Sequence, residues 1–331
     1  VIDTGQARLG GDMKKKQRAI TREIEQWRYE DISEDLHQRP RYDRERRVFF
    51  ALDASSMCLF NMFPRGEFTL EATVWEVVTA GFFARPPVTV EPYVGGNIGN
   101  TRTTVDEYGD RVVNANVKGD GWRRVHDTVL AVIMQTAQEL GACGRKEVHS
   151  LFSCLPGIDF WARAEEDDRF LRSRQGCVPD ALMRYYDGAA MSAEQLLELK
   201  LIRFGPSNYN LNDDKASQAA DRKARSFDAL YRRNLKAFDD KYWAKPPGTA
   251  ADAKGPAERR LMAFGGVKKK ICYGQFGECS EDTYTMMNDL ALGGAARYCG
   301  EMLCSSVGTA KGLLAYYCRA RFYFAAVREQ A

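Results

Sequence analysis

Hydrophobic and polar residues alternate most regularly in the segment QLLELKLIRF, residues 195–204. Successive side chains of a β-strand point to opposite faces of a sheet, so its leucines at alternate positions share one face. Glu198 and Lys200 then lie together on the other face. The pattern predicts a strand that buries leucines in a core and carries an acid and a base side by side. The alternative is a cross-strand or solvent-facing charged stripe on an amphipathic edge strand.

The neighbouring segments predict the other elements of an α/β unit. Residues 122–143 have apolar side chains at helical spacing, and Gly141 and Gly144 favour a stop. Strands are predicted at 147–155, 177–186 and 268–276. A charged helix is predicted over 215–243, and Ser280 is a suitable N-cap for another helix. The order αβββαβα predicts a small mixed β-sheet flanked by helices, an α/β fold.

The N-terminal third has a different pattern. Residues 1–17 are polar and aperiodic, which predicts a flexible lead-in. Residues 18–116 are expected to form a mainly helical accessory region, since apolar residues recur at helical spacing in residues 69–83. Three prolines and three glycines break any helix in residues 84–100 and favour a boundary. Residues 117–331 are expected to form the domain that contains the sheet.

Composition narrows the class of protein. The chain has 331 residues, of which 44% are hydrophobic, enough for a sizeable core. It contains no run of about 18 apolar residues and no signal-peptide pattern, so we expect no membrane insertion and an intracellular location. Nine cysteines without a CxxC pair and three histidines argue against a zinc cluster. Because the chain starts at Val1 and stops within a predicted helix, it is expected to be part of a longer product.

The charged pair of residues 195–204 acquires a chemical meaning if Asp180 lies beside it. This requires that the predicted strands 177–186 and 195–204 pair as a hairpin. Asp180 and Glu198 would then offer the hard oxygen ligands that suit Mg²⁺ or Mn²⁺. Lys200 would position the attacking water or stabilise charge that develops on a phosphate. Such a group is suited to phosphodiester hydrolysis.

Two further acids are candidates for additional metal ligands. Asp127 lies on the predicted helix 122–143, where it could instead pair with Arg123 or Arg124 one turn away. Glu147 lies at the start of a predicted strand, where it could face either the metal or water. The sequence leaves both alternatives open.

Pro179-Asp180 followed by Glu198-Leu199-Lys200 resembles the signature of the PD-(D/E)XK nuclease superfamily. This resemblance implies a restriction-endonuclease-like αβββαβ core over residues 121–290. It further implies a divalent-metal-dependent endonuclease that hydrolyses DNA, with Asp180, Glu198 and Lys200 as catalytic residues. More weakly, the segments KGDGWRRVHD, RQGCVPD, LLELKLIRFGPSNY and YGQFGECS resemble nuclease-like proteins of mobile elements in algae and other protists.

Cationic and aromatic residues near the predicted site are candidates for nucleic-acid contacts. On the helix before the signature these are Arg123, Arg124 and His126. On the helix after it they are Arg225, Tyr231 and Lys236. The QxxxY pattern of the superfamily is absent there, and interspersed aspartates also fit an ordinary charged helix face. The net charge is only +3, so any polyanion must bind to local clusters.

Other functions fit the same residues. The chain could be an inactive module that binds nucleic acid or assists assembly, or a structural shell protein of a viral or transposable element. RNA is not excluded as the substrate in place of DNA. A homo-oligomer and further domains of a polyprotein are open as partners, and a DNA enzyme of this kind is expected in the nucleus.

Overall fold

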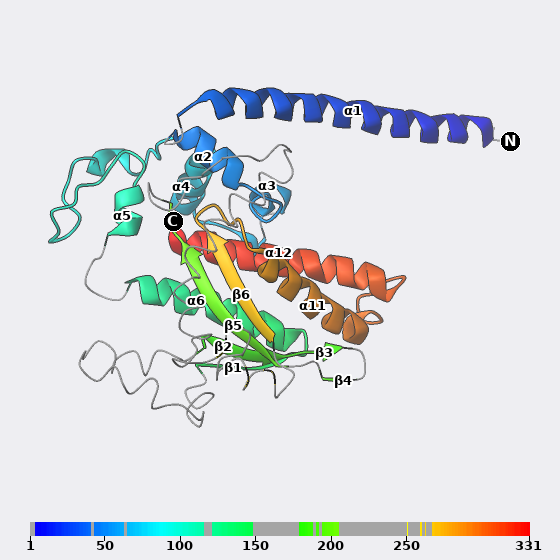
Figure 1. The fold of residues 1–331 in the computed structure, drawn as a ribbon. Coiled ribbons are helices and arrows are strands. Elements are labelled where there is room, and N and C mark those ends of the chain that lie inside the picture. Colours follow the sequence, from blue (N-terminus) through cyan, green and yellow to red (C-terminus); the bar gives the residue numbers. More distant parts are fainter. Residues whose placement is uncertain are drawn as a thin grey trace.

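The computed structural model describes residues 4–40, 43–62, 65–115, 121–147, 179–187, 190–191, 194–204 and 267–331, with Ala250, Arg259 and Met262. At its centre is a four-stranded mixed sheet with the strand order β1-β2-β5-β6 (Figure 1). Its strands are β1 (Cys143–Lys146), β2 (Ala181–Arg184), β5 (Gln195–Ile202) and β6 (Val267–Gly274). The first three are antiparallel to their neighbours, and β6 runs parallel to β5. The fold is therefore mixed α/β, as the sequence predicts.

Two short strands, β3 (Tyr186–Asp187) and β4 (Ala190–Met191), form a separate antiparallel pair after β2. The remaining connection between the described parts of β2 and β5 is short. This geometry returns the chain to the sheet beside the strand that it has just left, which is the hairpin arrangement expected from the sequence.

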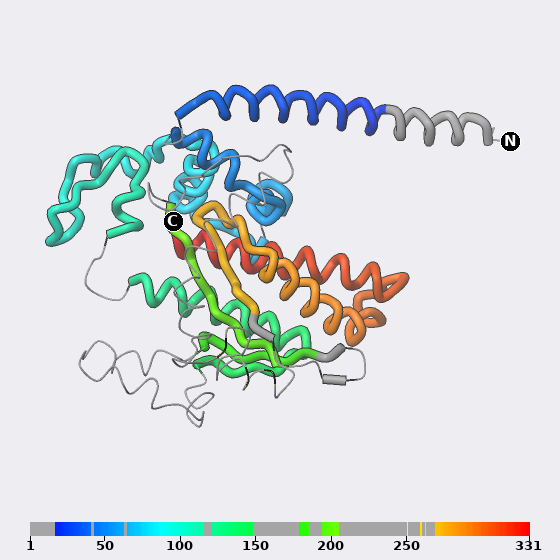
Figure 2. Tube along the Cα trace, viewed as in Figure 1, coloured from blue at the N-terminus to red at the C-terminus, as the bar shows by residue number. Residues whose placement is uncertain are grey.

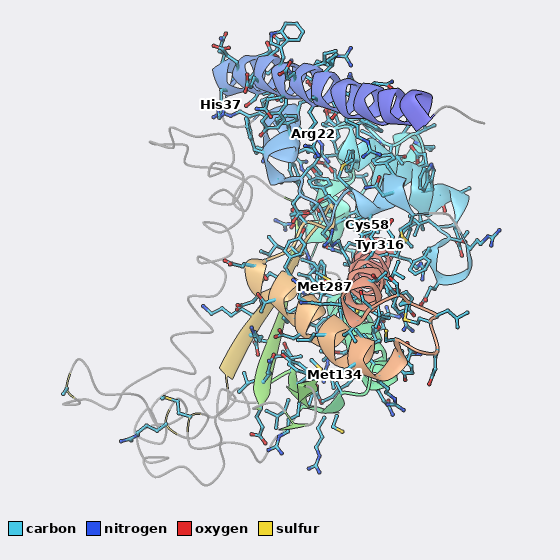
Figure 3. The ribbon with its side chains drawn as sticks, turned by 90° about the vertical axis from the view of Figure 1, so that its right-hand side faces the viewer. Arg22, His37, Cys58, Met134, Met287 and Tyr316 are labelled. Carbon is cyan, nitrogen blue, oxygen red and sulfur yellow. The ribbon has the colours of Figure 1, made fainter. Side chains whose placement is uncertain are left out.

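Three helices form the main core on one face of the sheet. They are α6 (Gly121–Glu139), α11 (Glu281–Tyr298) and α12 (Val307–Gln330). Leu197 and Leu199 of β5 are buried against them, together with Met183 of β2 and Met287 of α11. Met134 packs at the edge of the same cluster, below Met287 in Figure 3. The alternation of β5 thus has the predicted effect of directing leucines into the core.

The N-terminal region consists of short helices, three of which pack on α12 through residues 58–78. The short helices are α2 (Arg44–Ala51), α3 (Cys58–Asn61), η1 (Gly66–Phe68), α4 (Ala72–Phe82), η2 (Glu91–Tyr93) and α5 (Asp110–Asn114). Cys58 and Leu59 share a buried cluster with Tyr323 and Phe324 of α12. At the margin of this contact the Tyr316 hydroxyl donates a hydrogen bond to the Asn61 carbonyl oxygen, with Tyr316 and Cys58 close together in Figure 3. The C-terminal end of α12 lies beside α4 (Figure 2).

The first helix, α1 (Thr4–Gln38), extends away from the rest of the molecule (Figure 1). Only its C-terminal part packs on the body, where Leu36 is buried and Tyr29 stacks on Phe49. The sequence predicts a flexible lead-in over residues 1–17, whereas α1 already begins at Thr4. The helix therefore incorporates most of the segment that was expected to be irregular.

Among the described residues after 117, the predicted elements overlap those of the structure except at β1. The helix α6 ends as expected, because Gly141 has a φ of 88° that suits glycine and turns the chain into the sheet. The Ser280 side chain caps α11 by accepting a hydrogen bond from the Thr283 amide. No strand was predicted at β1, Cys143–Lys146. The predicted strand 147–155 follows it, but residues 148–155 lie outside the described residues, as does the predicted helix 215–243.

Two expectations from composition can be compared with the described residues. All seven cysteines among them are free thiols. None of their helices combines the length and the hydropathy that crossing a bilayer would require.

Candidate functional site

Asp180 lies directly beside the charged face of β5. The antiparallel register pairs Ala181 with Leu197 and Leu182 with Leu196, so the next residue, Asp180, lies level with Glu198. The Leu199 amide donates a hydrogen bond of 2.7 Å to Asp180 Oδ2. Ala181 points into the core, and Asp180 therefore belongs to the opposite face, which it shares with Glu198 and Lys200. The hairpin on which the sequence hypothesis depends thus brings these three residues together.

Glu198 and Lys200 form an ion pair within the sheet. Lys200 Nζ lies 3.1 Å from Glu198 Oε1. The Glu198 side chain is only 7% exposed, whereas that of Lys200 is 40% exposed. Because β5 lies between β2 and β6, it is an inner strand, and the alternative of a solvent-facing stripe on an edge strand is wrong. Lys200 connects a buried carboxylate to the surface.

The charge state of Lys200 follows from its surroundings. Burial lowers the pKa of the ammonium, but its attraction to Glu198, the hydrogen bond that it donates to Glu198 and the charge of Asp180 raise the pKa by more. The net pKa is above its ordinary value of 10.5. Lys200 is therefore protonated at neutral pH, and it can donate hydrogen bonds and neutralise negative charge but cannot act as a base.

His126 of α6 is held between two aspartates. Its Nε2 lies 3.3 Å from Asp180 Oδ2, and its Nδ1 lies 3.1 Å from Asp127 Oδ1. The start of α6 is fixed over the sheet because the Arg203 guanidinium stacks on the Trp122 ring at 3.6 Å. With α6 fixed in this way, the His126 ring holds the Asp180 carboxylate in its orientation from the side of the helix.

The two additional acids of the sequence hypothesis lie close to the site but interact with an arginine. Asp127 Oδ2 is 3.8 Å from Arg123, and Glu147 Oε1 is 3.9 Å from the same side chain. Glu147 directly follows β1, and its amide donates to the Asp180 carbonyl oxygen. Its φ of 45° is left-handed, which costs a residue other than glycine about 1 kcal/mol. Both carboxylates are half exposed.

A metal site can be judged from the donors that the described residues provide. Asp180 and Glu198 offer two carboxylates on adjacent strands, the donor type and number with which Mg²⁺ is commonly bound together with several waters. Both contacts of Asp180 described above use Oδ2, and Oδ1 takes part in neither. No group of three or more His, Cys, Asp or Glu side chains suited to a metal is present in the described part of the chain. The residues fit a metal held by two carboxylates, and Glu147 and Asp127 do not complete a larger set there.

Of the residues predicted to contact nucleic acid, the structure describes those on α6 and not those predicted on the later helix. Arg124 is exposed on the first turns of α6, and Arg123 is occupied by Asp127 and Glu147. The predicted residues Arg225, Tyr231 and Lys236 lie outside the described residues.

Lys270 is a basic residue near the site that the sequence reasoning missed. The parallel register of β5 and β6 pairs Lys270 with Glu198, so both side chains lie on the same face of the sheet. The same register pairs Cys272 with Lys200, and burial raises the pKa of the Cys272 thiol well above its ordinary value, which keeps it unreactive. The signal was the run of three lysines at 268–270, but its position beside Glu198 depends on a pairing between distant segments.

The contact between His126 and Asp180 predicts a pH-dependent stability. Burial lowers the pKa of His126, but Asp180 and then Asp127 raise it by more, so the net pKa is above 6.5. A raised pKa means that the protonated ring stabilises the fold below the pKa of the unfolded chain, about 6.5, and that this contribution is lost as pH rises through the folded value. We therefore expect His126→Gln to reduce the free energy of unfolding more at mildly acidic than at alkaline pH.

Urea unfolding of both chains across this pH range measures the effect. NMR titration of the His126 ring gives its pKa directly. A difference in stability that is the same at every pH would contradict the ion pair.

Comparison of the chain with models of known families, with curated proteins and with solved structures finds no match.

Proposed function

We propose that this protein is a divalent-metal-dependent nuclease of the PD-(D/E)XK type that hydrolyses phosphodiester bonds of DNA. The proposal is based on three side chains, Asp180, Glu198 and Lys200, that lie on one face of two adjacent strands. A purely structural ion pair would need only one of the two acids. The second acid, level with the first in the register, supports a function that requires two carboxylates.

The single observation that carries the proposal is the hydrogen bond from the Leu199 amide to Asp180. It joins the Pro-Asp segment to the middle of the Glu-X-Lys segment, although 18 positions separate the two acids in the sequence. The order of elements supports the same interpretation. A helix precedes three antiparallel strands, and the last strand, β6, pairs parallel to β5, as the αβββαβ core of the superfamily would require.

Each residue has a distinct task in this proposal. Asp180 and Glu198 would hold Mg²⁺ or Mn²⁺, which when bound lowers the pKa of a water and neutralises charge on the phosphate. Hydrolysis adds the water oxygen to phosphorus and breaks one bond to a bridging oxygen, so negative charge accumulates on the phosphate. The protonated Lys200, partly exposed beside Glu198, donates to this phosphate or orients the water. His126 acts as a positioning residue for Asp180.

The surface around the site provides some of the charge needed to bind a polyanion. Arg124 is exposed on α6, two residues before His126, and Lys270 lies level with Glu198 on the site face of the sheet. Contacts of this kind neutralise backbone phosphates and make binding sensitive to salt. They do not distinguish DNA from RNA, so both are included as substrates in the test below.

The decisive experiment is cleavage of supercoiled plasmid and of RNA by the purified chain with Mg²⁺ or Mn²⁺, and with EDTA as the metal-free control. We expect metal-dependent nicking by the wild type and a loss of about a hundredfold or more in Lys200→Met, because the ammonium next to the phosphate is removed. Lys200→Arg keeps the charge and is the matched control, expected to retain part of the activity.

Because Lys200→Met leaves the buried Glu198 carboxylate without its cation, the unfolding of each variant must be measured in parallel. Equal cleavage by the wild type and Lys200→Met would contradict the role of Lys200. Salt-sensitive binding of DNA by the wild type without cleavage under any metal condition would favour the inactive binding module instead.

A further inference from the structure

Helix α1 carries an apolar stripe that faces away from the body of the protein. Ile20, Ile24 and Trp27 are 57%, 46% and 65% exposed. Their spacing of four and three residues places them on one face of the helix. Tyr29 and Leu36, which contact the body, lie on the opposite face. The exposure of three large apolar side chains in a row is a feature of interaction surfaces rather than of a solvated helix.

The charges of α1 are segregated on either side of this stripe. Residues 4–22 contain six lysines and arginines and one aspartate, whereas residues 23–38 contain six acidic residues and one arginine. The apolar stripe spans the junction between the two halves. This division places like charges four residues apart within each half, such as Arg18 with Arg22 and Asp31 with Asp35, which destabilises a helix on its own.

We propose that α1 is a dimerisation element that pairs antiparallel with α1 of a second copy of this chain. In this orientation the basic half of each helix lies along the acidic half of the other. If Ile20 of one copy lies level with Ile24 of the other, the two apolar stripes overlap around the junction. The unfavourable order of charges in a single helix is then neutralised in both copies at once.

The structure gives such a pair room to form. The helix spans 35 residues, which corresponds to a length of about 50 Å. It projects from the body, so much of its length is accessible to another chain (Figure 1). A nucleic acid fits this helix less well, because the six acidic residues on its second half would repel phosphates. The dimer is independent of the nuclease proposal, because α1 contributes none of the residues of the candidate site.

Sedimentation velocity of the full chain over a concentration series tests the proposal. We expect the wild type to reach twice the mass of the single chain and Ile24→Glu to remain at the single-chain mass. Ile32→Glu is the matched control, because Ile32 is also exposed, at 48%, but lies on a different face of α1. Far-UV circular dichroism verifies that the variants keep their helix.

Charge reversal tests the antiparallel orientation. Changing Lys14, Lys15 and Lys16 to glutamate is expected to abolish the dimer. Adding Glu30→Lys and Asp31→Lys, which lie level with residues 14 and 13 in this register, is expected to restore it. The proposal is overturned if the wild type remains a single chain at all concentrations. Binding of DNA by α1 in a protein that stays a single chain would overturn it equally. Dissociation by Ile32→Glu as complete as that by Ile24→Glu overturns the assigned face, and failure of the second set of reversals to restore the dimer overturns the orientation.

Discussion

Asp180→Asn is expected to reduce metal-dependent DNA cleavage by about a hundredfold to a thousandfold, while the free energy of unfolding changes by no more than about 1 kcal/mol near pH 8. The asparagine side chain has the same shape as aspartate. Its oxygen can still accept the hydrogen bond from the Leu199 amide, which joins β2 to β5. What the substitution removes is the negative charge, and with it one of the two carboxylates that the register places level on these strands.

Asp127→Asn is the matched control for this experiment. Asp127 also contacts His126, but through Nδ1, and its side chain is 52% exposed beside Arg123. If the proposal is correct, its replacement alters cleavage by less than about tenfold. Plasmid nicking under saturating Mn²⁺, measured together with thermal unfolding, separates the two variants. Equal losses in Asp180→Asn and Asp127→Asn would mean that the surroundings of His126, and not the pair Asp180 and Glu198, determine activity.

The dependence of cleavage on Mn²⁺ concentration tests whether Asp180 binds the metal and Lys200 does not. Loss of a carboxylate ligand weakens metal binding, so the Mn²⁺ concentration that gives half-maximal activity should rise in Asp180→Asn. Lys200→Met should instead lower the maximal rate, with a smaller change in the Mn²⁺ concentration required. The two substitutions therefore have different kinetic signatures, although both variants are expected to be poor nucleases. Identical metal dependence in both would contradict their distinct roles.

The candidate site was largely predictable because its information is local. The alternation in residues 195–204 is sufficient to place Leu197 and Leu199 in a core and Glu198 on the opposite face. The short connection between two strand-like segments favours a hairpin, and the hairpin makes Asp180 a neighbour of Glu198. The nuclease function that was inferred from these residues remains a prediction.

Two elements, β1 and the first half of α1, differ from what was expected, and their surroundings explain why. Strand β1 is at the edge of the sheet, and all four of its residues, Cys143–Lys146, are exposed. An edge strand without a buried face has no apolar alternation to reveal it, so the apolar run that follows was taken as the strand. The extent of α1 was missed for a similar reason, because its first half has few apolar residues and contains glycines.

Contacts between distant segments were not predictable from a single sequence. The parallel pairing of β5 with β6 joins residues that are more than 60 positions apart, and only this pairing brings Lys270 level with Glu198. The attachment of the N-terminal region is a second example. Residues 18–116 were expected to form an accessory region, and the sequence did not reveal where this region attaches. Its described part shares a buried cluster with α12, and Asp53 contacts Cys279 in the connection between β6 and α11.

Asp53→Ala is expected to destabilise the protein by roughly 3 kcal/mol, the largest effect on stability that we predict for a residue outside the main core. The Asp53 carboxylate accepts hydrogen bonds from both parts of the chain. Oδ1 accepts from the amides of Ser55 and Ser56 in its own turn, and Oδ2 accepts from the Cys279 amide and the Tyr284 hydroxyl. Burial, and then the nearby Cys279 and Asp53, raise the pKa of Tyr284 far above 10, so its hydroxyl remains a donor.

Removal of this carboxylate leaves the buried amides of Ser56 and Cys279 without their acceptor, and each such loss costs about 1–3 kcal/mol. Urea unfolding measures the effect. Asp106→Ala is the matched control, because Asp106 accepts from the single exposed amide of Arg111 and should cost less than about 1 kcal/mol. Asp53→Asn keeps one oxygen acceptor and should fall between the two. If Asp53→Ala and Asp106→Ala were equally stable, Asp53 would not be the residue that fastens the N-terminal region to Cys279 and α11, and the attachment would depend on the contacts with α12.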